Sequence, residues 1–219
     1  MTKLDKIVQI PVGQLTLEGD LHLGNKQAIV LFAHGSGSSR HSPRNKYVAD
    51  MLQNAGLGTL LFDLLTKDEE RIDEQTTHLR FNILLLADRL IAATEWLAVQ
   101  DDIISRDVKI GYFGASTGAA AALVAAAKRQ NKIGAVVSRG GRPDLAGQYL
   151  EQVRASTLLI VGGNDHRVID MNKEAFEKLK IKDKRLDIVP RATHLFEEPG
   201  KLEEVAIIAR GWFERYLLT

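Results

Sequence analysis

A serine flanked by glycines lies near the middle of the chain, in the pentapeptide Gly114-Ala115-Ser116-Thr117-Gly118. The pattern G-x-S-x-G is typical of a nucleophile elbow, in which a serine is held on a sharp turn between a strand and a helix. Such a turn brings the residues two before and two after the serine close together, so both must be small. Both are glycine here. The motif is short and also arises by chance, so its meaning depends on what surrounds it.

The residues on either side of the pentapeptide have the composition that an elbow requires. Residues 108–113 form an apolar run, broken only by Lys109 and Gly111, which predicts a buried strand. Residues 119–127 are rich in alanine and predict a buried helix. The small Ala119 lets that helix lie close to the sheet. The surroundings therefore favour a catalytic Ser116 over a serine in an ordinary turn.

A serine hydroxyl is a poor nucleophile unless a base removes its proton, and the base needs a third group to orient it. Asp165 follows an apolar run at residues 157–161, and His194 follows another at residues 186–189. The chain order Ser116, Asp165, His194 is the order of the α/β-hydrolase arrangement. The sequence thus predicts that Ser116 attacks, His194 transfers the proton and Asp165 orients His194.

The loop at residues 34–39, His-Gly-Ser-Gly-Ser-Ser, follows a continuous apolar run at residues 28–33. Acyl transfer through a serine needs two N–H donors aimed at the oxyanion of the tetrahedral intermediate. One comes from the residue after the nucleophile and the other from a loop of this kind. We therefore expect the backbone N–H groups of Thr117 and Ser36 to form the oxyanion hole.

The remaining pattern predicts the α/β class, with a mostly parallel eight-stranded sheet and helices on both faces. An antiparallel hairpin is expected at residues 6–22, followed by strands and helices in alternation. Residues 1–219 are expected to form a single domain. Too few residues separate Ser138 from Thr157 for an inserted cap domain. The polar stretch at residues 66–80 is interpreted as a solvated surface loop, with a mobile rim over a pocket as the alternative.

Composition and charge exclude several classes of function. The chain has 219 residues, a formal net charge of +1 and no cysteine. The small charge gives no reason to expect nucleic acid or an anionic membrane as a partner. Without cysteine there can be no disulfide, thiolate metal site or cysteine nucleophile. The first residues have no apolar signal-peptide core, so we expect a cytoplasmic protein.

Five motifs together resemble those of the dienelactone hydrolase family within the α/β-hydrolase fold. They are AHGSGSSRHSPRN, GYFGASTGAAAAL, VSRGGRPDLAG, LLIVGGNDHRV and ATHLFEEPG. The chain is most similar to a bacterial branch with a serine nucleophile, sometimes joined to a phosphoribosyltransferase-like module. The resemblance implies the roles given above for Ser116, Asp165 and His194, and it implies no cofactor. Founding members of the family have cysteine at the position of Ser116, so their lactone substrate does not transfer directly.

Several charged residues also follow strands and are candidates for other roles. Arg139 is flanked by Gly140 and Gly141, which allow its side chain to turn into a pocket and bind a substrate carboxylate. The alternative is an internal ion pair, for example with the acidic stretch at 68–74. Arg142 has the same two alternatives. His34 is expected to be a structural hydrogen-bonding residue, with substrate binding as the alternative.

The other candidates are weaker. Asp63 and Asp144 are alternative acids for the triad, and His166 is an alternative base beside Asp165. Arg40 and Arg44 are expected to pair with nearby carboxylates or to cap the following helix. The other histidines lack the spacing of metal ligands, so no metal site is expected. They are His22, His41 and His78.

We therefore expect a serine hydrolase that cleaves small carboxylic esters, lactones or thioesters through an acyl-enzyme intermediate. The expected partner is a small-molecule substrate, with no nucleic acid and no membrane, and a homodimer is possible. The alternative is a non-catalytic ligand-binding or interaction module on the same fold.

Overall fold

The computed structural model describes residues 5–218, and within them eight strands form one sheet. The order across the sheet is β1-β2-β4-β3-β5-β6-β7-β8. The hairpin β1–β2 and the pair β2–β4 are antiparallel, whereas all later pairs are parallel. The strands are β1 (Asp5–Val12), β2 (Leu15–His22), β3 (Ala28–Ala33), β4 (Gly58–Phe62), β5 (Lys109–Ala115), β6 (Ile133–Arg139), β7 (Ser156–Gly162) and β8 (Lys184–Val189).

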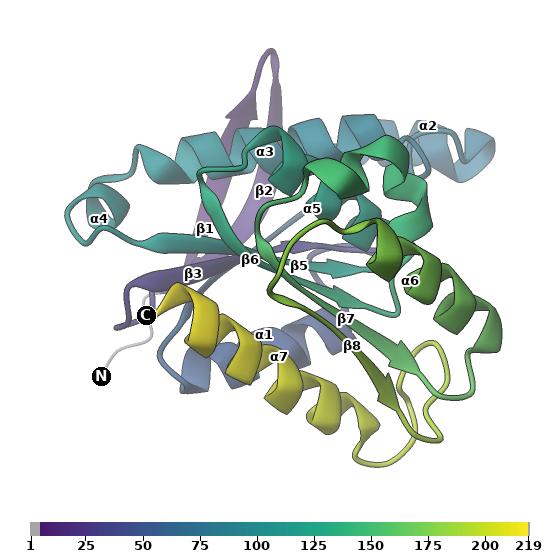
Figure 1. The fold of residues 1–219 in the computed structure, drawn as a ribbon. Coiled ribbons are helices and arrows are strands. Elements are labelled where there is room, and N and C mark those ends of the chain that lie inside the picture. The colour runs from purple at the N-terminus through teal and green to yellow at the C-terminus, as the bar shows by residue number, and fades with distance from the viewer. Residues whose placement is uncertain (1–4, 219) are drawn as a thin grey trace.

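Helices cover both faces of this sheet, as the sequence predicts (Figure 1). On one face lie α1 and α7, and on the other lie α3, α5, α6 and the 3-10 segment η1. Between β6 and β7 there is only η1, so no cap domain is inserted there. None of the helices in the described range is long and apolar enough to cross a bilayer. The helices are α1 (Pro43–Asn54), α2 (Lys67–Thr76), α3 (Ile83–Ala98), α4 (Asp101–Ile104), α5 (Thr117–Lys128), η1 (Pro143–Gln152), α6 (His166–Lys178) and α7 (Lys201–Leu217).

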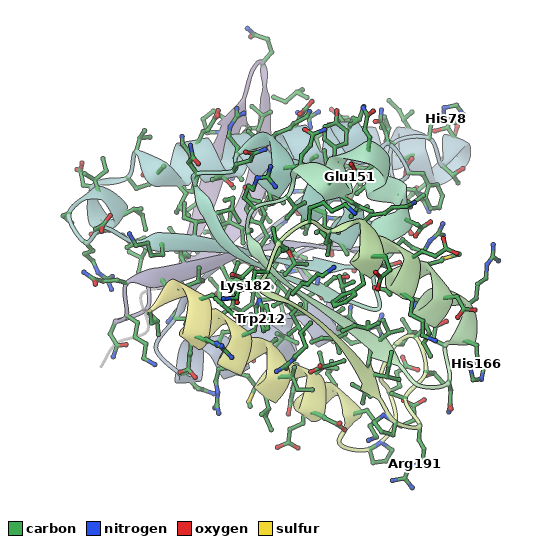
Figure 2. All side chains as sticks on the ribbon, viewed as in Figure 1. His78, Glu151, His166, Lys182, Arg191 and Trp212 are labelled. Atoms are coloured by element: carbon green, nitrogen blue, oxygen red, sulfur yellow. The ribbon has the colours of Figure 1, made fainter. Side chains whose placement is uncertain are left out.

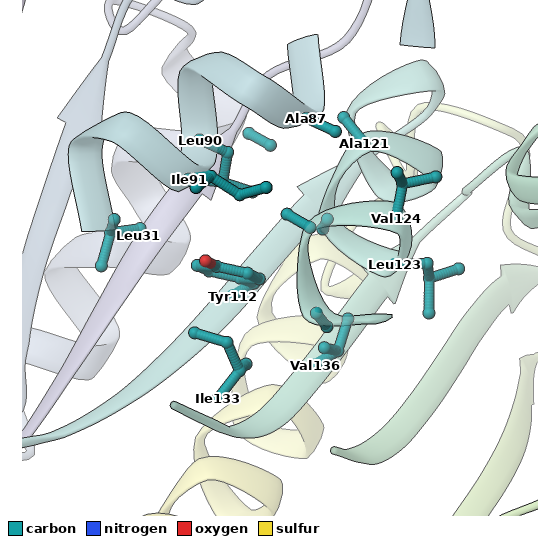
Figure 3. Close-up of a cluster of buried hydrophobic side chains, with 14 of the residues drawn as sticks. Leu31, Ala87, Leu90, Ile91, Tyr112, Ala121, Leu123, Val124, Ile133 and Val136 are labelled. Carbon is teal, nitrogen blue, oxygen red and sulfur yellow. The ribbon is translucent and has the colours of Figure 1, made fainter. Parts of the chain in front are cut away.

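Two apolar clusters, one on each face, hold these layers together. In the larger cluster α3 and α5 pack against each other above the central strands (Figure 3). Tyr112 of β5 lies fully buried among Leu90, Ile91 and Val136, and its hydroxyl is 2.6 Å from that of Thr94. The alanines of α5 are small enough for the helix to approach the sheet closely, which makes the position of its N-terminus well defined.

The sheet has a topological switch point at β3, which pairs with β4 on one side and β5 on the other. Ligands in open α/β sheets bind at the carboxyl ends of the strands beside such a point. Ala33 at the end of β3 pairs with Gly114 near the end of β5. The loop after β3 therefore passes beside Ser116, and a Cβ atom at Gly35 would lie 3.1 Å from the Cβ of Ser116.

The turn from β5 to α5 forces Ser116 into an unusual backbone conformation, with φ 50° and ψ −122°. Non-glycine residues rarely adopt positive φ, and where they do the strain often marks a functional site. The flanking glycines have no room for a side chain. A Cβ at Gly114 would lie 2.4 Å from the Cα of Ala119, and one at Gly118 would lie 2.2 Å from the carbonyl oxygen of Ala33.

The loop after β3 starts at His34, whose buried ring is held at both nitrogens. Nε2 accepts a hydrogen bond from the backbone N–H of Leu64 at 3.1 Å, and Nδ1 lies 3.0 Å from the carbonyl oxygen of Gly35. An N–H donor at Nε2 and a carbonyl at Nδ1 together require the neutral ring with its proton on Nδ1. His34 therefore ties the ends of β3 and β4 together, which is the structural role that the sequence favours.

The interpretation of residues 66–80 as a loop is wrong for most of that stretch, because α2 occupies Lys67–Thr76. The helix starts with a capping box, in which the Thr66 hydroxyl accepts from the N–H of Glu69 and the Glu69 carboxylate accepts from the N–H of Thr66. The pattern T-x-x-E is present in the sequence and predicts a helix start. The helix was not predicted because α2 is highly charged and has too few apolar residues to show a helical periodicity.

Replacing Gly118 with valine tests the elbow. We expect Gly118→Val to lower the stability by about 3 kcal/mol and the midpoint of thermal unfolding by roughly 6–12 °C, with loss of activity, because the new side chain overlaps backbone atoms. The matched control is Gly211→Val, since nothing lies within 4 Å of a Cβ there. Thermal unfolding followed by circular dichroism measures the stability of both variants, and an assay of ester hydrolysis measures their activity. A Gly118→Val variant as stable and as active as wild type would show that residues 114–118 are an ordinary turn.

The buried ring of His34 predicts a pH dependence of stability. Burial lowers the pKa of His34, although the Gly35 carbonyl and Asp63 act in the opposite direction. Above about pH 6.5 the ring is neutral in both the folded and unfolded chain, and its contribution to stability is complete. Below that pH the His34 ring binds a proton in the unfolded chain but not in the folded chain. The stability therefore falls by up to about 1.4 kcal/mol per pH unit until the pH reaches the pKa of His34 in the folded chain.

Urea unfolding at stepped pH values between 8 and 5 measures this slope. We expect His34→Gln to be less stable than wild type at pH 8 but to lose less stability between pH 6.5 and pH 5. An equal slope in the two proteins would assign the dependence to other groups.

Candidate active site

The structure brings His194 and Asp165 together, although 28 residues lie between them in the sequence. Asp165 follows β7 and precedes α6, and His194 lies in the loop between β8 and α7. Nδ1 of His194 is 2.7 Å from Oδ2 of Asp165. The Asp165 carboxylate accepts a hydrogen bond from the N–H at Nδ1, which leaves Nε2 of the neutral ring as an acceptor. This arrangement suits a histidine that acts as a base.

Ser116 and His194 line the same cavity, which has a volume of about 260 Å³. Its walls come from the loop after β3, the first turn of α1 and the end of β6. Ser116 is partly exposed, whereas the residues on either side of it are buried. The elbow therefore presents the serine side chain at the surface of this cavity.

The end of β6 fixes the backbone of the serine. The N–H of Ser116 donates to the carbonyl oxygen of Arg139 at 3.2 Å, and the N–H of Arg142 donates to the carbonyl oxygen of Ser116 at 3.0 Å. Gly140 has φ 51°, and a Cβ there would lie 3.5 Å from the ring of His194. The segment from Arg139 to Arg142 is thus in contact with both the elbow and the histidine.

The two expected oxyanion donors differ in their present surroundings. Thr117 is the first residue of α5, so its N–H has no acceptor within the helix. The N–H of Ser36 donates to Oγ1 of Thr117 at 2.9 Å. This hydrogen bond holds the loop after β3 against the elbow. It also means that the Ser36 N–H must leave the Thr117 hydroxyl before it can bind an oxyanion.

Arg139 lies in the cavity with an almost fully buried side chain, 6% exposed. Its Nη2 is 3.5 Å from Oδ1 of Asn45, a long contact, and its Nε has no partner among the described residues. Burial, with a smaller contribution from the nearby Arg44, lowers the pKa of Arg139 to about 10. The guanidinium is therefore still charged at neutral pH. It forms no ion pair with the acidic stretch at 68–74 within residues 5–218.

The alternative acids are engaged elsewhere. Asp63 pairs with Arg40, which also binds Glu18, and Asp144 accepts two hydrogen bonds from Arg142 at 2.9 and 2.8 Å. Arg142 is therefore a partner of Asp144 two residues along the chain, and it is not among the residues that line the cavity.

The other histidines lie away from the cavity of Ser116. His166 is exposed and projects outward at the start of α6, and His78 lies just beyond the C-terminal end of α2 (Figure 2). His34 lines a neighbouring cavity on the other side of the loop after β3. Within residues 5–218 no group of three or more side chains is placed to hold a metal ion.

Sequence reasoning did not place Asn45 or Arg44 at the cavity, although both residues line it. Asn45 is buried in the first turn of α1, where its amide contacts Arg139. A Ser-Pro pair at residues 42–43 marks the start of that helix in the sequence. Placing the helix start beside β6, however, requires the three-dimensional fold.

Comparisons with known proteins agree with this geometry at the level of family and fold. The model of the dienelactone hydrolase family matches residues 20–215. The crystal structure of a dienelactone hydrolase from Anabaena variabilis is similar over 98% of this chain and 99% of its own, with 59% sequence identity and a TM-score of 0.95. Est1E from Butyrivibrio proteoclasticus has the same fold at 15% identity, with a TM-score of 0.78 over 95% of this chain and 98% of its own.

Two proteins of Mycobacterium tuberculosis are 55% identical over 214 residues, and both carry a provisional name as phosphoribosyl transferases. The match covers 97% of this chain but 47% of theirs, so the chain spans about half the length of these curated relatives. Their name describes proteins that are about twice as long. Because the family model covers most of the chain, we conclude that this protein belongs to the dienelactone hydrolase family.

Proposed function

We propose that this protein is a serine hydrolase that cleaves small carboxylic esters, lactones or thioesters through an acyl-enzyme intermediate on Ser116. The observation that carries the proposal is the 2.7 Å hydrogen bond between His194 and Asp165, at the cavity that Ser116 lines. A serine in a strained elbow, a histidine with its second nitrogen free and an orienting carboxylate are the parts that acyl transfer requires.

The first half-reaction forms the acyl-enzyme. Nε2 of His194 takes the proton from Oγ of Ser116 as that oxygen attacks the carbonyl carbon of the substrate. The carbonyl π bond opens, and its electron pair moves onto the oxygen. Asp165 stabilises the imidazolium that forms and keeps it oriented. When the tetrahedral intermediate collapses, the bond to the leaving oxygen or sulfur breaks and His194 returns the proton to it.

In the second half-reaction water replaces the serine. His194 removes a proton from water as the water oxygen attacks the acyl carbon, and it then protonates the departing Oγ of Ser116. The products are a carboxylic acid and the free enzyme. Apart from the water molecule consumed in the second step, no group outside the chain and the substrate is needed to balance either step.

Both tetrahedral intermediates place a negative charge on the former carbonyl oxygen. We infer that the N–H groups of Thr117 and Ser36 bind it. The Thr117 N–H belongs to the first turn of α5, where the helix dipole also favours negative charge. For Ser36 to contribute, its hydrogen bond to the Thr117 hydroxyl must be exchanged for one to the oxyanion.

The size of the cavity supports a small substrate. A volume of about 260 Å³ lies just below the usual range for small-molecule sites. The absence of an inserted cap between β6 and β7 leaves the site open on its outer side. We therefore expect activity on short acyl groups and little on long fatty acyl chains.

Single replacements in the proposed triad should nearly abolish turnover. We expect Ser116→Ala and His194→Ala each to lower kcat by roughly 10⁴- to 10⁶-fold, with the double variant little worse, because the two side chains act as a unit. Asp165→Asn should cost less than the loss of Ser116, because the imidazole remains available in the wrong tautomer. Steady-state kinetics on a short-chain aryl ester measures all four variants. If Ser116→Ala kept more than a tenth of wild-type turnover, the assignment of the nucleophile would be wrong.

A fluorophosphonate probe separates this proposal from a non-catalytic ligand-binding module on the same fold. Only an activated hydroxyl reacts with the probe at an appreciable rate, so we expect wild type to be labelled at Ser116 and Ser116→Ala to stay unlabelled. Ser138, which is fully buried, should stay unlabelled in both proteins. An intact, folded wild-type protein that takes up no probe would favour the binding module.

A further inference from the structure

The first turn of α1 presents positive charge to the cavity of Ser116. Ser42 is the N-cap of this twelve-residue helix, Pro43 is its first residue, and no acidic residue lies in the first turn. The N-terminal end of a helix carries a partial positive charge that acidic side chains usually balance. Here the first turn holds Arg44, which lines the cavity and adds a full positive charge. That arrangement is unfavourable for the helix itself.

Arg139 reaches the same place from the opposite side, where its Nη2 contacts the amide of Asn45. The Nε of Arg139 and the Nε of Arg44 are both buried, and both lack a hydrogen-bond partner among the described residues. Arg44 has one acidic partner, Glu197, at 3.2 Å, and that carboxylate is 64% exposed. Two guanidinium groups thus share a corner of the cavity with little compensating negative charge.

None of the residues that line the cavity is acidic. The neighbouring cavity beyond the loop after β3 is different, because Glu70, Asp73 and Glu74 line it with a single arginine, Arg80, which pairs with Asp73. The balance of charge therefore differs between the two sides of this loop. A substrate with an anionic group would place that group on the side of Arg139.

We propose that Arg139, Arg44 and the first turn of α1 form a subsite for a phosphate monoester group carried by the substrate. A phosphate monoester has a charge between about −1.5 and −2 at neutral pH and three strong acceptor oxygens. Two guanidinium groups and a helix N-terminus match that charge, and arginine binds phosphate through paired N–H groups. A single carboxylate would leave one of the two guanidinium groups uncompensated.

This inference rests on the proposed function, since it names the class of substrate: a small ester, lactone or thioester that also carries a phosphate. Arg139 would have two tasks. Its carbonyl oxygen holds the N–H of Ser116, and its side chain binds the phosphate. A phosphate bound at this residue is therefore held at a fixed place relative to the nucleophile, which raises the effective concentration of the ester at Ser116.

Binding of inorganic phosphate tests the subsite independently of catalysis. At a phosphate concentration ten times its Kd, we expect the midpoint of thermal unfolding of wild type to rise by roughly 3–6 °C relative to sodium chloride of equal ionic strength. Ser116→Ala should show the same rise, which keeps this test separate from the identity of the nucleophile. Arg139→Gln should show none. The control Arg71→Gln, an exposed residue on α2, should behave as wild type.

Arg44→Gln provides a second variant if Arg139→Gln fails to fold, because the Arg44 side chain is already 33% exposed. Arg44→Gln should also reduce the phosphate-dependent rise in the midpoint of thermal unfolding. Without phosphate we expect Arg139→Gln to unfold at a temperature equal to or above that of wild type, since the change removes a buried charge that lacks a carboxylate partner. A phosphate effect that survives in Arg139→Gln or, if that variant does not fold, in Arg44→Gln would overturn the proposal.

Three matched esters, with a neutral, a carboxylate or a phosphate group on otherwise identical acyl chains, test the substrate class. We expect kcat/KM of wild type to be roughly ten- to a hundredfold higher for the phosphate ester than for the neutral ester. Arg139→Gln should remove most of that ratio, and Arg71→Gln should keep it. Hydrolysis with no preference among the three overturns the subsite but leaves the proposed function standing. A preference for the carboxylate ester, or phosphate binding without any preference for the phosphate ester, also overturns it.

Discussion

The site depends on one steric constraint, the absence of space around Ser116. The carbonyl oxygens of Ala33 and His34 occupy the volume that a side chain at Gly118 would need, and the backbone of α5 does the same at Gly114. Close packing of this kind fixes positions to within a fraction of an ångström. It brings the end of β3, the end of β5 and the N-terminus of α5 together, so a serine, an amide donor and the loop after β3 meet at one edge of the sheet.

Three largely buried arginines outside the cavity have carboxylate partners, whereas Arg139 in the cavity has none among the described residues. Arg80 and Arg89 bind Asp73 and Glu69 on α2, and Arg40 lies among three carboxylates. Arg139, by contrast, is buried without an acidic partner in the described range, and Ser116 has a strained backbone. Natural proteins tend to give up stability where function requires it. The unpartnered Arg139 and the strained Ser116 therefore indicate a functional site at the same cavity as the hydrogen bond between His194 and Asp165.

Much of this fold can be predicted from local sequence patterns, without knowledge of the tertiary structure. Continuous apolar runs predict the buried parallel strands, and the glycines at 114 and 118 predict the elbow because no other residue fits there. The helix α2 was missed because its capping box at Thr66 stands before a sequence with few apolar residues. The sequence could not predict that Arg142 pairs with a carboxylate whereas Arg139 lies in the cavity without one. The difference depends on whether an acid lies within reach, and Asp144 reaches only Arg142.

The central claim is that Ser116 carries the acyl group during turnover. Acid quenching of wild-type protein within the first turnovers of a short-chain aryl ester, followed by mass spectrometry of its peptides, tests it most directly. The account predicts an acylated peptide containing Ser116, formed during an initial burst of the released alcohol and lost as the substrate is consumed. Turnover with the acyl group on a different residue, or turnover without any acylated peptide under conditions that show a burst, would contradict it.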